Sequence, residues 1–428
     1  MTTGCRPPGI VHRVGSQLDR PPGWTSRPRV LVLTPDFPPS HGGIQLLVHR
    51  VVAGWDEIDT TVVTLTGNGG HTFDATQSFA VRRVGRPRAA RALSVASLNA
   101  HGVVVGLRSK PHAVLCAHIV CSPAAAVLRK LRNIPVLQYL YAKEIDGRPR
   151  LARFATTRAE RVVAISGYTR DLALTLGAAP RSVRLIPPGV DLPAERLMDR
   201  SDRPTIVTVA RLRDAYKGHD VLLDALPRVR EDVPDVRWVV VGDGPLRPSL
   251  QAEVQRRGLG AVVEFVGAVS DHERDAWLDR AWVFTMPSRT PPGSMSGEGF
   301  GIVYLEAGAH GVPVLAGNVG GALDAVKHEE TGLLVDPTDS AAVAHGLLRL
   351  LTDKKLAARF GAAGRERAQT FAWRLIAARV QEEMLDLIRH SRGHGRSPVL
   401  PAHDLMVPPT SREGLPLTPP SSAINPVP

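Results

Sequence analysis

Two glutamates, Glu298 and Glu306, enclose an almost wholly apolar segment within the stretch GEGFGIVYLEAGAHGVP, residues 297–313. If the stretch were one helix, eight residues at about 100° each would put the carboxylates on different faces, about 12 Å apart along the axis. If Glu298 instead lies in a glycine-rich loop and Glu306 inside the next helix, both border one cleft. The free N–H groups of the first helical turn open into the same space. We therefore predict an anion site between two acceptors for hydroxyl groups.

Two cations, Arg211 and Lys217, flank a predicted turn in VARLRDAYKGHD, just after a predicted strand. A guanidinium binds phosphate oxygens in pairs and an ammonium acts as a point charge, so together they could clamp a diphosphate. The alternative is that both are solvated surface cations that hold nothing.

Glycines occur where predicted strands end, in PPSHGGIQ and in VGDGP. Gly42, Gly43 and Gly242 would let the backbone approach a phosphate or a nucleobase closely, because glycine has no side chain to obstruct the approach. A plain tight turn accounts for each of them equally well.

Val266, in FVGAVSDHE, could offer main-chain groups to a nucleobase. The same stretch contains Ser270 and Glu273 at the spacing of a capping box, which explains those two residues by helix capping alone. Both interpretations stay open for this segment.

Composition limits the classes of protein to consider. The 428 residues are 43% hydrophobic, include only three cysteines without a CxxC pair, and carry a net charge of +12. No apolar run approaches 18 residues and no export signal is evident at the start, so we expect a protein without a membrane span, located in the cytoplasm. Structural zinc and disulfides are not expected. The arginines are scattered without interleaved aromatics, which favours solvated helix faces over nucleic-acid binding.

The order of the predicted elements favours an α/β protein. Short β-branched runs alternate with amphipathic helical stretches from Pro28 onward, with a polar, proline-flanked break at DLPAERLMDRSDRP. This pattern is typical of doubly wound parallel sheets, whose ligands bind beyond the carboxyl ends of the strands. We predict a disordered extension over 1–27, a Rossmann-like domain over 28–191, a linker over 192–203, a second Rossmann-like domain over 204–370, a returning helix over 371–391 and a disordered tail over 392–428.

Taken together and in this order, these motifs resemble the family 4 glycosyltransferases, which have the GT-B fold of two Rossmann-like domains facing a cleft. Glu298 and Glu306 match the family's pattern of two acids separated by seven residues. The likeness covers roughly residues 28–390. The stretches TPDFPPSHGGIQ and MPSRTPPGSMSGEGFGIVYLEAGAHGVPVLAGNVGG look most similar to actinobacterial phosphatidylinositol-mannoside mannosyltransferases that use GDP-mannose.

The resemblance implies roles for particular residues. Glu306 would bind the ribose, Arg211 and Lys217 the diphosphate, and Glu298 with the backbone of Phe300 and Gly301 the donor sugar. The candidate catalytic residues are Glu298, Lys143, Arg211 and Lys217. The candidate donor-binding residues are Gly42, Gly43, Arg211, Lys217, Gly242, Val266, Glu298, Phe300, Gly301, Ile302 and Glu306. The acceptor candidates are Asp36, His118, Tyr141 and Glu144.

One position departs from the family. Its members carry a histidine just before a glutamate after the fourth or fifth strand, whereas YLYAKEID has Lys143 before Glu144. A protonated lysine is a poor base at neutral pH. Transfer assisted by the leaving phosphate remains possible, because the phosphate itself can take the acceptor's proton.

The expected function is therefore a retaining, metal-independent transfer of a hexose from a nucleotide-diphosphate sugar, with GDP-mannose as the best candidate. No cofactor is expected, since the nucleotide sugar is a substrate. The acceptor is a phosphoinositol lipid, with arginines of VRRVGRPRAARAL on an anionic membrane surface, or a soluble natural-product hydroxyl. One alternative is a nucleotide-sugar-binding partner with little transfer activity, in which Lys143 in place of the histidine indicates that catalysis has been lost. The other is a sugar-nucleotide epimerase.

Overall fold

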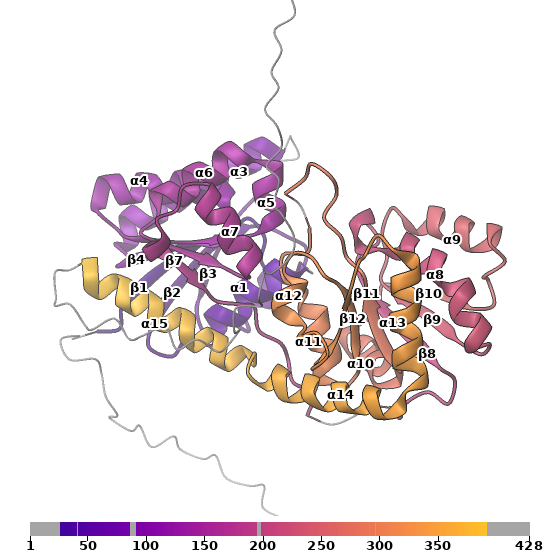
Figure 1. Ribbon diagram of the computed structural model, residues 1–428. Coiled ribbons are helices and arrows are strands. Elements are labelled where there is room, and N and C mark those ends of the chain that lie inside the picture. Colours follow the sequence, from indigo (N-terminus) through magenta and orange to yellow (C-terminus); the bar gives the residue numbers. More distant parts are fainter. Residues whose placement is uncertain (1–25, 41, 86–90, 195–197, 296, 392–428) are drawn as a thin grey trace, which may run out of the picture. The chain divides into compact units, whose positions relative to one another are not determined.

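The computed structural model describes residues 26–40, 42–85, 91–194, 198–295 and 297–391, which form two compact units (Figure 1). The first unit contains the chain up to Leu192 together with Pro291–Ser296 and Ala368–Ile388. The second contains Pro193–Thr290, Gly297–Arg367 and the residues from Arg389. Each unit is an α/β body built on one parallel sheet, as the alternation in the sequence predicts.

The first unit has a seven-stranded parallel sheet with the strand order β3-β2-β1-β4-β5-β6-β7. The central strands β1, β4 and β5 are buried almost throughout, which explains their runs of valine and leucine. The strands are β1 Arg29–Leu33, β2 Asp59–Leu65, β3 Ala80–Val84, β4 Ala113–Cys116, β5 Val136–Leu140, β6 Arg161–Ala164 and β7 Val183–Leu185.

Helices cover both faces of this sheet. The helices are α1 Gly43–Ala53, α2 Gly70–Asp74, α3 Arg91–Ser109, α4 Ser122–Arg132, α5 Ala142–Gly147, α6 Pro149–Arg158, α7 Gly167–Thr175 and α15 Trp373–Ser391, with short 3-10 turns at Ile119–Cys121 and Pro180–Ser182. Figure 1 shows α3, α4 and α6 along one face and α15 along the other. Helix α15, the last one that the structure describes, thus completes the core of the first unit, burying among others Ile376, Val380 and Met384.

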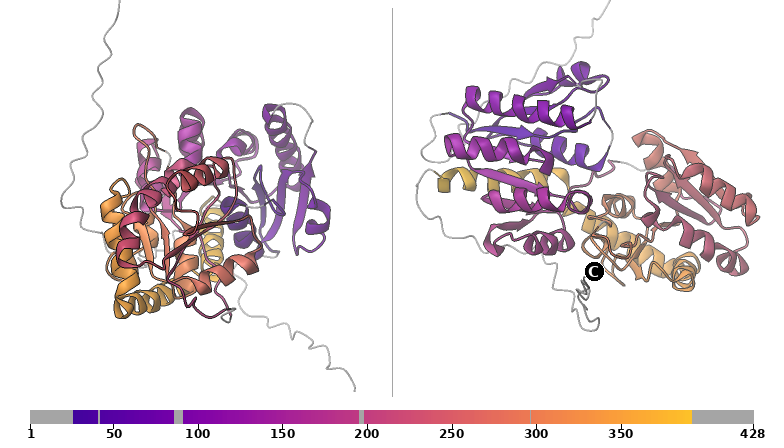
Figure 2. Two further views of the ribbon diagram at one scale, coloured as in Figure 1. Left: turned by 90° about the vertical axis from the view of Figure 1, so that its right-hand side faces the viewer. Right: turned by 90° about the horizontal axis from the view of Figure 1, so that it is seen from above.

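The second unit has a six-stranded parallel sheet with the order β10-β9-β8-β11-β12-β13. Figure 2 gives two further views of the ribbon, in which this unit is coloured from rose to orange. Its strands are β8 Thr205–Val209, β9 Arg237–Val241, β10 Val263–Gly267, β11 Val283–Met286, β12 Val314–Gly317 and β13 Gly332–Val335. Its helices are α8 His219–Asp232, α9 Arg247–Arg256, α10 Asp271–Arg280, α11 Ile302–Ala309, α12 Ala322–Ala325, α13 Ser340–Thr352 and α14 Lys354–Gln369, with a 3-10 turn at Ala215–Lys217. Apolar residues of α8, α13 and α14 share one core with the sheet.

One strand was not predicted. Strand β3 is an edge strand that pairs with β2, and its arginines obscured the period-two pattern of a half-buried strand. Arg83 is not available to a membrane surface as proposed above, because its side chain is 3% exposed, pairs with Asp74 and bonds the carbonyl of Pro38. Residues 86–90 of the same stretch, and nearly all of both predicted disordered ends, lie outside the described residues.

Candidate functional site

The two glutamates lie as the loop-then-helix prediction requires. Strand β11 ends at Met286, Glu298 lies in the loop that follows, and Glu306 lies within helix α11, which begins at Ile302. The loop is held from a second side, because the N–H of Gly321 donates to the carbonyl of Glu298 over 2.8 Å. The NVGG stretch, residues 318–321, therefore holds the loop between β11 and α11 in place.

The start of α11 depends on a glycine. Gly301 is the N-cap residue with φ +87°, in the left-handed region, and a Cβ there would lie 2.2 Å from Cε2 of Tyr304. Tyr304 is itself buried, and its hydroxyl donates to the carbonyl of Met286 over 2.7 Å. Phe300 is 2% exposed, so its side chain anchors the loop while Ile302 begins the helix. The site loop is thus fixed to the end of β11.

Lys217 and Glu298 form an ion pair between the turn after β8 and the loop before α11. Both side chains are largely buried, at 16% and 12% exposed. Burial opposes the charge on Lys217, but the Glu298 carboxylate outweighs it and the pKa of Lys217 is raised. The predicted diphosphate-binding lysine and sugar-binding glutamate are therefore adjacent.

Arg211 lies at the other side of the same turn and is exposed to solvent. The turn between them contains Tyr216, whose ring lies 5.2 Å from the Lys217 ammonium. Next to Lys217, the buried ring of His219 packs on Trp238, and burial together with the Lys217 charge lowers the pKa of His219 to about 4. His219 is therefore neutral near pH 7 and adds no charge to the site.

Sequence reasoning missed Arg274, which comes from helix α10. Its guanidinium Nη1 lies 3.6 Å from Oε1 of Glu306, and the two side chains are 20% and 14% exposed. The only signal available was an arginine inside the stretch SDHERD, which also contains the capping box. That capping box is confirmed, since Ser270 and Glu273 bond reciprocally at the start of α10.

Gly242 allows the ends of neighbouring strands to approach each other closely. It follows β9 with φ +136°, its N–H donates to the carbonyl of Gly267 over 2.8 Å, and a Cβ would lie 1.9 Å from the carbonyl oxygen of Ala210. The close approach of these strand ends gives Gly242 a structural role of its own. Val266 lies in β10 and is partly buried, and no contact of the described residues assigns it to a base.

In the first unit, Gly42 and Gly43 lie at the start of α1, as predicted from the glycine pair. The N-cap residue, Gly42, provides no side-chain hydrogen bond to the first turn of this helix. Asp36 lies in the loop between β1 and α1 and is partly buried. The amino terminus of α1 is thus compatible with an anion.

His118 and Glu144 come together at the carboxyl ends of β4 and β5, with Nε2 and Oε1 2.8 Å apart. The backbone N–H of Val120 donates to Nδ1 of His118 over 3.2 Å, which places the proton of a neutral ring on Nε2, facing Glu144. Burial raises the pKa of Glu144, although His118 partly offsets this. Both ring nitrogens are therefore engaged within this unit.

Lys143 lies on α5 with an exposed side chain, whereas the adjacent Glu144 is buried. The histidine beside Glu144 in space is thus His118, from a different strand end, rather than the preceding residue in the chain. Tyr141 is also buried there, stacked on Tyr139 with ring centroids 6.0 Å apart. Cys116 and Cys121 are free buried thiols nearby, and burial raises the pKa of each.

The segment Pro291–Ser296, which immediately precedes the Glu298 loop in the chain, belongs to the first unit. Asp146 at α5 accepts bonds from the N–H of Met295 over 2.8 Å and from Oγ of Ser294 over 3.1 Å. The hydroxyl of Tyr168 donates to the carbonyl of Met295 over 2.7 Å. The segment between β11 and Glu298 is therefore held by hydrogen bonds to Asp146 and Tyr168.

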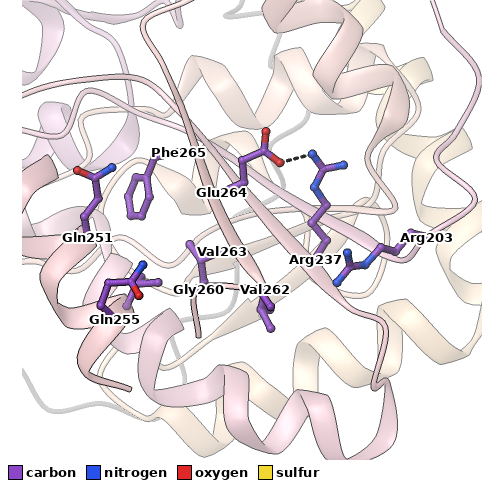
Figure 3. A pocket seen from close by; sticks show the side chains of 11 residues that line it. Arg203, Arg237, Gln251, Gln255, Gly260, Val262, Val263, Glu264 and Phe265 are labelled. Atoms are coloured by element: carbon purple, nitrogen blue, oxygen red, sulfur yellow. Dashed lines mark hydrogen bonds and ion pairs between the residues drawn. The ribbon is translucent and has the colours of Figure 1, made fainter. Parts of the chain in front are cut away.

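A pocket of about 550 Å³ lies at the edge strand β10 and helix α9 (Figure 3). Figure 3 shows Glu264 pointing toward Arg237, with which it pairs, and Arg203 donates to the carbonyl of Val236 over 3.2 Å. None of the predicted site residues lines this pocket. Its charged groups are satisfied by the protein itself, so it is not the candidate site.

Within residues 26–391, gaps excepted, no three His, Cys, Asp or Glu side chains are arranged to hold a metal ion. Among the described helices, none has the length and hydropathy needed to cross a bilayer.

Comparison with protein families gives matches to both units. Residues 41–193 match the profile of Glycosyltransferase Family 4, and residues 195–367 match that of Glycosyl transferases group 1. The GDP-mannose-dependent alpha-(1-6)-phosphatidylinositol monomannoside mannosyltransferase of Mycobacterium tuberculosis is 33% identical over 387 residues, which covers 83% of this chain and 97% of the relative. The monoacylated-lipid counterpart from Corynebacterium glutamicum is 30% identical, covering 82% and 96%.

Solved structures share the fold at lower identity. Sucrose-phosphate synthase from Thermosynechococcus elongatus superposes with a TM-score of 0.70 at 22% identity, covering 85% of this chain and all of that one. HepE from Anabaena in complex with UDP-glucose superposes with a TM-score of 0.68 at 20% identity, covering 84% and 99%. These likenesses bear on the fold, and they agree with the two parallel-sheet units.

Proposed function

The chain belongs to the family 4 and group 1 glycosyltransferases, and on that premise we propose that it transfers mannose from GDP-mannose to a phosphoinositol-type glycolipid with retention of configuration. The donor and acceptor are those for which the mycobacterial and corynebacterial relatives are named. The GT-B fold and the transferase class follow from membership of the family. The sugar, the acceptor, the stereochemistry and metal independence are the parts proposed.

The observation that carries the proposal is the Lys217–Glu298 ion pair beside the amino terminus of α11. A diphosphate entering this space meets the ammonium of Lys217, the guanidinium of Arg211 at the same turn, and the positive end of a helix. A buried acid next to the lysine is then released to accept hydroxyls of the donor sugar. The second acid, Glu306, lies further along α11 for the ribose.

In the proposed reaction, the bond between the anomeric carbon and the diphosphate oxygen breaks. A bond to the acceptor oxygen forms on the same face of the sugar, and the acceptor's proton passes to the departing phosphate. Lys217 and Arg211 stabilise the negative charge that grows on the leaving group, which is the work that a metal ion would otherwise do. The proposed reaction therefore uses no metal and no cofactor.

The first unit supplies the acceptor candidates. His118 has both ring nitrogens engaged, one by the Val120 N–H and one by Glu144, so its role is to donate from Nε2 or to orient Glu144. Glu144 and Tyr141 are buried beside it. Lys143 is exposed on α5, and we retain it as a candidate cation rather than as a base. A lipid acceptor also implies peripheral contact with an anionic membrane, which stays a proposal.

The test is a transfer assay with the full chain and a panel of nucleotide sugars, with and without phosphoinositol mannosides in anionic vesicles. We expect GDP release only with GDP-mannose, acceleration by the lipid acceptor, an α-linked product by NMR, and activity that survives a chelator. Glu298→Gln should abolish turnover in a chain that still unfolds cooperatively, at a lower melting temperature because Lys217 loses its partner. Nucleotide binding without turnover on any acceptor would leave the binding-partner alternative, and a free epimeric nucleotide sugar would indicate an epimerase.

A further inference from the structure

Arg274 is a cation that no motif predicted and that lies against the second acid of the site. Its Nη1 lies 3.6 Å from Oε1 of Glu306, which is beyond a hydrogen bond but within an ion pair. Burial opposes the charge on Arg274, yet Glu306 and Asp275 outweigh it, so its pKa is raised. The arginine is therefore charged at any working pH, and so it can act on Glu306 as a permanent cation.

The guanidinium of Arg274 is held in a fixed plane by its own helix. Nε and Nη2 both donate to Oδ1 of Asp275, over 3.0 and 2.8 Å, and Nη1 donates to Oδ1 of Asp271 over 2.9 Å. Bonds from several nitrogens of one guanidinium fix its direction as well as its position. Glu306 thus faces a cation that cannot swing freely.

A histidine connects the same two helices on the far side of Asp275. His310 caps the end of α11, its Nε2 lies 3.9 Å from Oδ1 of Asp275, and its Nδ1 lies 2.7 Å from Oδ1 of Asp279. His310 and Asp279 are 4% and 1% exposed. The N–H of His310 also donates to the carbonyl of Glu306 over 3.2 Å. Helices α10 and α11 are thereby tied together around the Glu306 carboxylate.

We propose that Arg274 is a positioning residue, which holds the carboxylate of Glu306 for the hydroxyl groups of the donor ribose. The inference rests on the proposed function, since it takes Glu306 to be the ribose-binding acid. A carboxylate accepts hydroxyl bonds well when it is ionised and held still, and partial burial works against ionisation unless a cation is near. Arg274 is that cation, and it belongs to the protein and not to the bound nucleotide.

The charge around Arg274 argues against a direct role on the diphosphate. One guanidinium faces three carboxylates, those of Asp271, Asp275 and Glu306. The cluster is net negative, so it does not attract a second anion. Lys217, by contrast, pairs with Glu298, and is the cation that a diphosphate would engage.

The experiment measures how strongly the protein prefers ribose over 2′-deoxyribose. The dissociation constants of GDP and 2′-deoxy-GDP are determined by calorimetry for the wild type, Arg274→Met, Arg274→Lys and the control Arg280→Met. Arg280 is on the same helix, but its guanidinium lies over the ring of Trp277 at 5.2 Å. Melting temperatures without ligand report whether each variant is folded.

We expect the wild type to prefer GDP, and Arg274→Met to lose about tenfold of that preference, as for one hydrogen bond to a charged group. Arg274→Lys should recover part of it, and Arg280→Met should keep all of it. A purely structural role would weaken both nucleotides equally and leave the ratio unchanged, which would overturn the inference alone. No ribose preference in the wild type would overturn the ribose role of Glu306 as well.

Discussion

Gly301 is the residue at which the Glu298 loop turns into helix α11. Its φ of +87° is unfavourable for any residue with a Cβ, and the space where a Cβ would go is already filled by the ring of Tyr304. Position 301 therefore requires glycine both for its backbone conformation and for the lack of space for a Cβ. Because Glu298 and Glu306 lie on either side of it, its geometry sets their separation.

We predict that Gly301→Ala lowers the free energy of unfolding by about 1–3 kcal/mol and weakens nucleotide binding. The matched control is Gly258→Ala, where φ is +65° but no atom lies within 4 Å of the added Cβ. There only the backbone term applies, about 1 kcal/mol, with binding unchanged. Urea unfolding and calorimetry with GDP make the comparison. Equal losses in both variants, with binding intact, would show that the Tyr304 contact has no effect.

At this scale the sequence predicted the residue types better than their partners. Glu298, Glu306 and Lys217 were identified by spacing and chemistry, because a strand end followed by a helix has few possible geometries. Arg274 was not, since nothing in SDHERD signals that one arginine reaches a glutamate 32 positions later. The same holds for the pairing of His118 with Glu144, which depends on two neighbouring strands ending at the same edge.

Helix α15 illustrates how an element far along the chain completes a distant core. It belongs to the first unit through Ile388, and Gln381 on it accepts the N–H of Asp56 over 3.0 Å and donates to the carboxylate of Asp56 over 2.8 Å. Its buried residues recur at helical spacing, so the helix itself was predictable. The surface that it covers was not, because periodicity says only that one face is buried.

We predict that Met384→Ala, at a fully buried position of α15, lowers the stability of the first unit by about 2–5 kcal/mol. Leu375→Ala on the same helix is the matched control, because Leu375 is 36% exposed and its loss should cost below about 1 kcal/mol. Hydrogen exchange resolved by peptide would assign the loss to strands β1–β7. Destabilisation confined to the second unit would contradict the assignment of α15.

Two sheets with separate cores make up the whole molecule. The hydrophobic clusters are distinct, one built on β8–β13 with α8, α9 and α13, the others on strands of the first sheet with α3, α4 and α6. Each unit is large enough to fold as a body of its own. The residues that we assign to the nucleotide, apart from Gly42 and Gly43, lie in the second unit.

From this we predict two thermal transitions, of which a nucleoside diphosphate raises mainly the one belonging to the second unit. At a ligand concentration about 100 times the dissociation constant, the stabilisation is about 2.7 kcal/mol. Calorimetric scans with and without GDP test this, and limited proteolysis assigns the transitions. If GDP raised only the transition of the first unit, the donor residues would be wrongly placed.

The sequence alone determined the α/β class, every strand but β3 among those that the structure describes, the family and the residue types of the candidate site. These follow from local patterns, namely apolar runs, glycines at strand ends and acids at fixed spacing. Tertiary structure alone decided which charges meet: Lys217 with Glu298, Arg274 with Glu306, and His118 with Glu144. It also decided that residues 291–296 join the first unit. Such pairings depend on strand order and helix packing, which bring together residues that no sequence window contains.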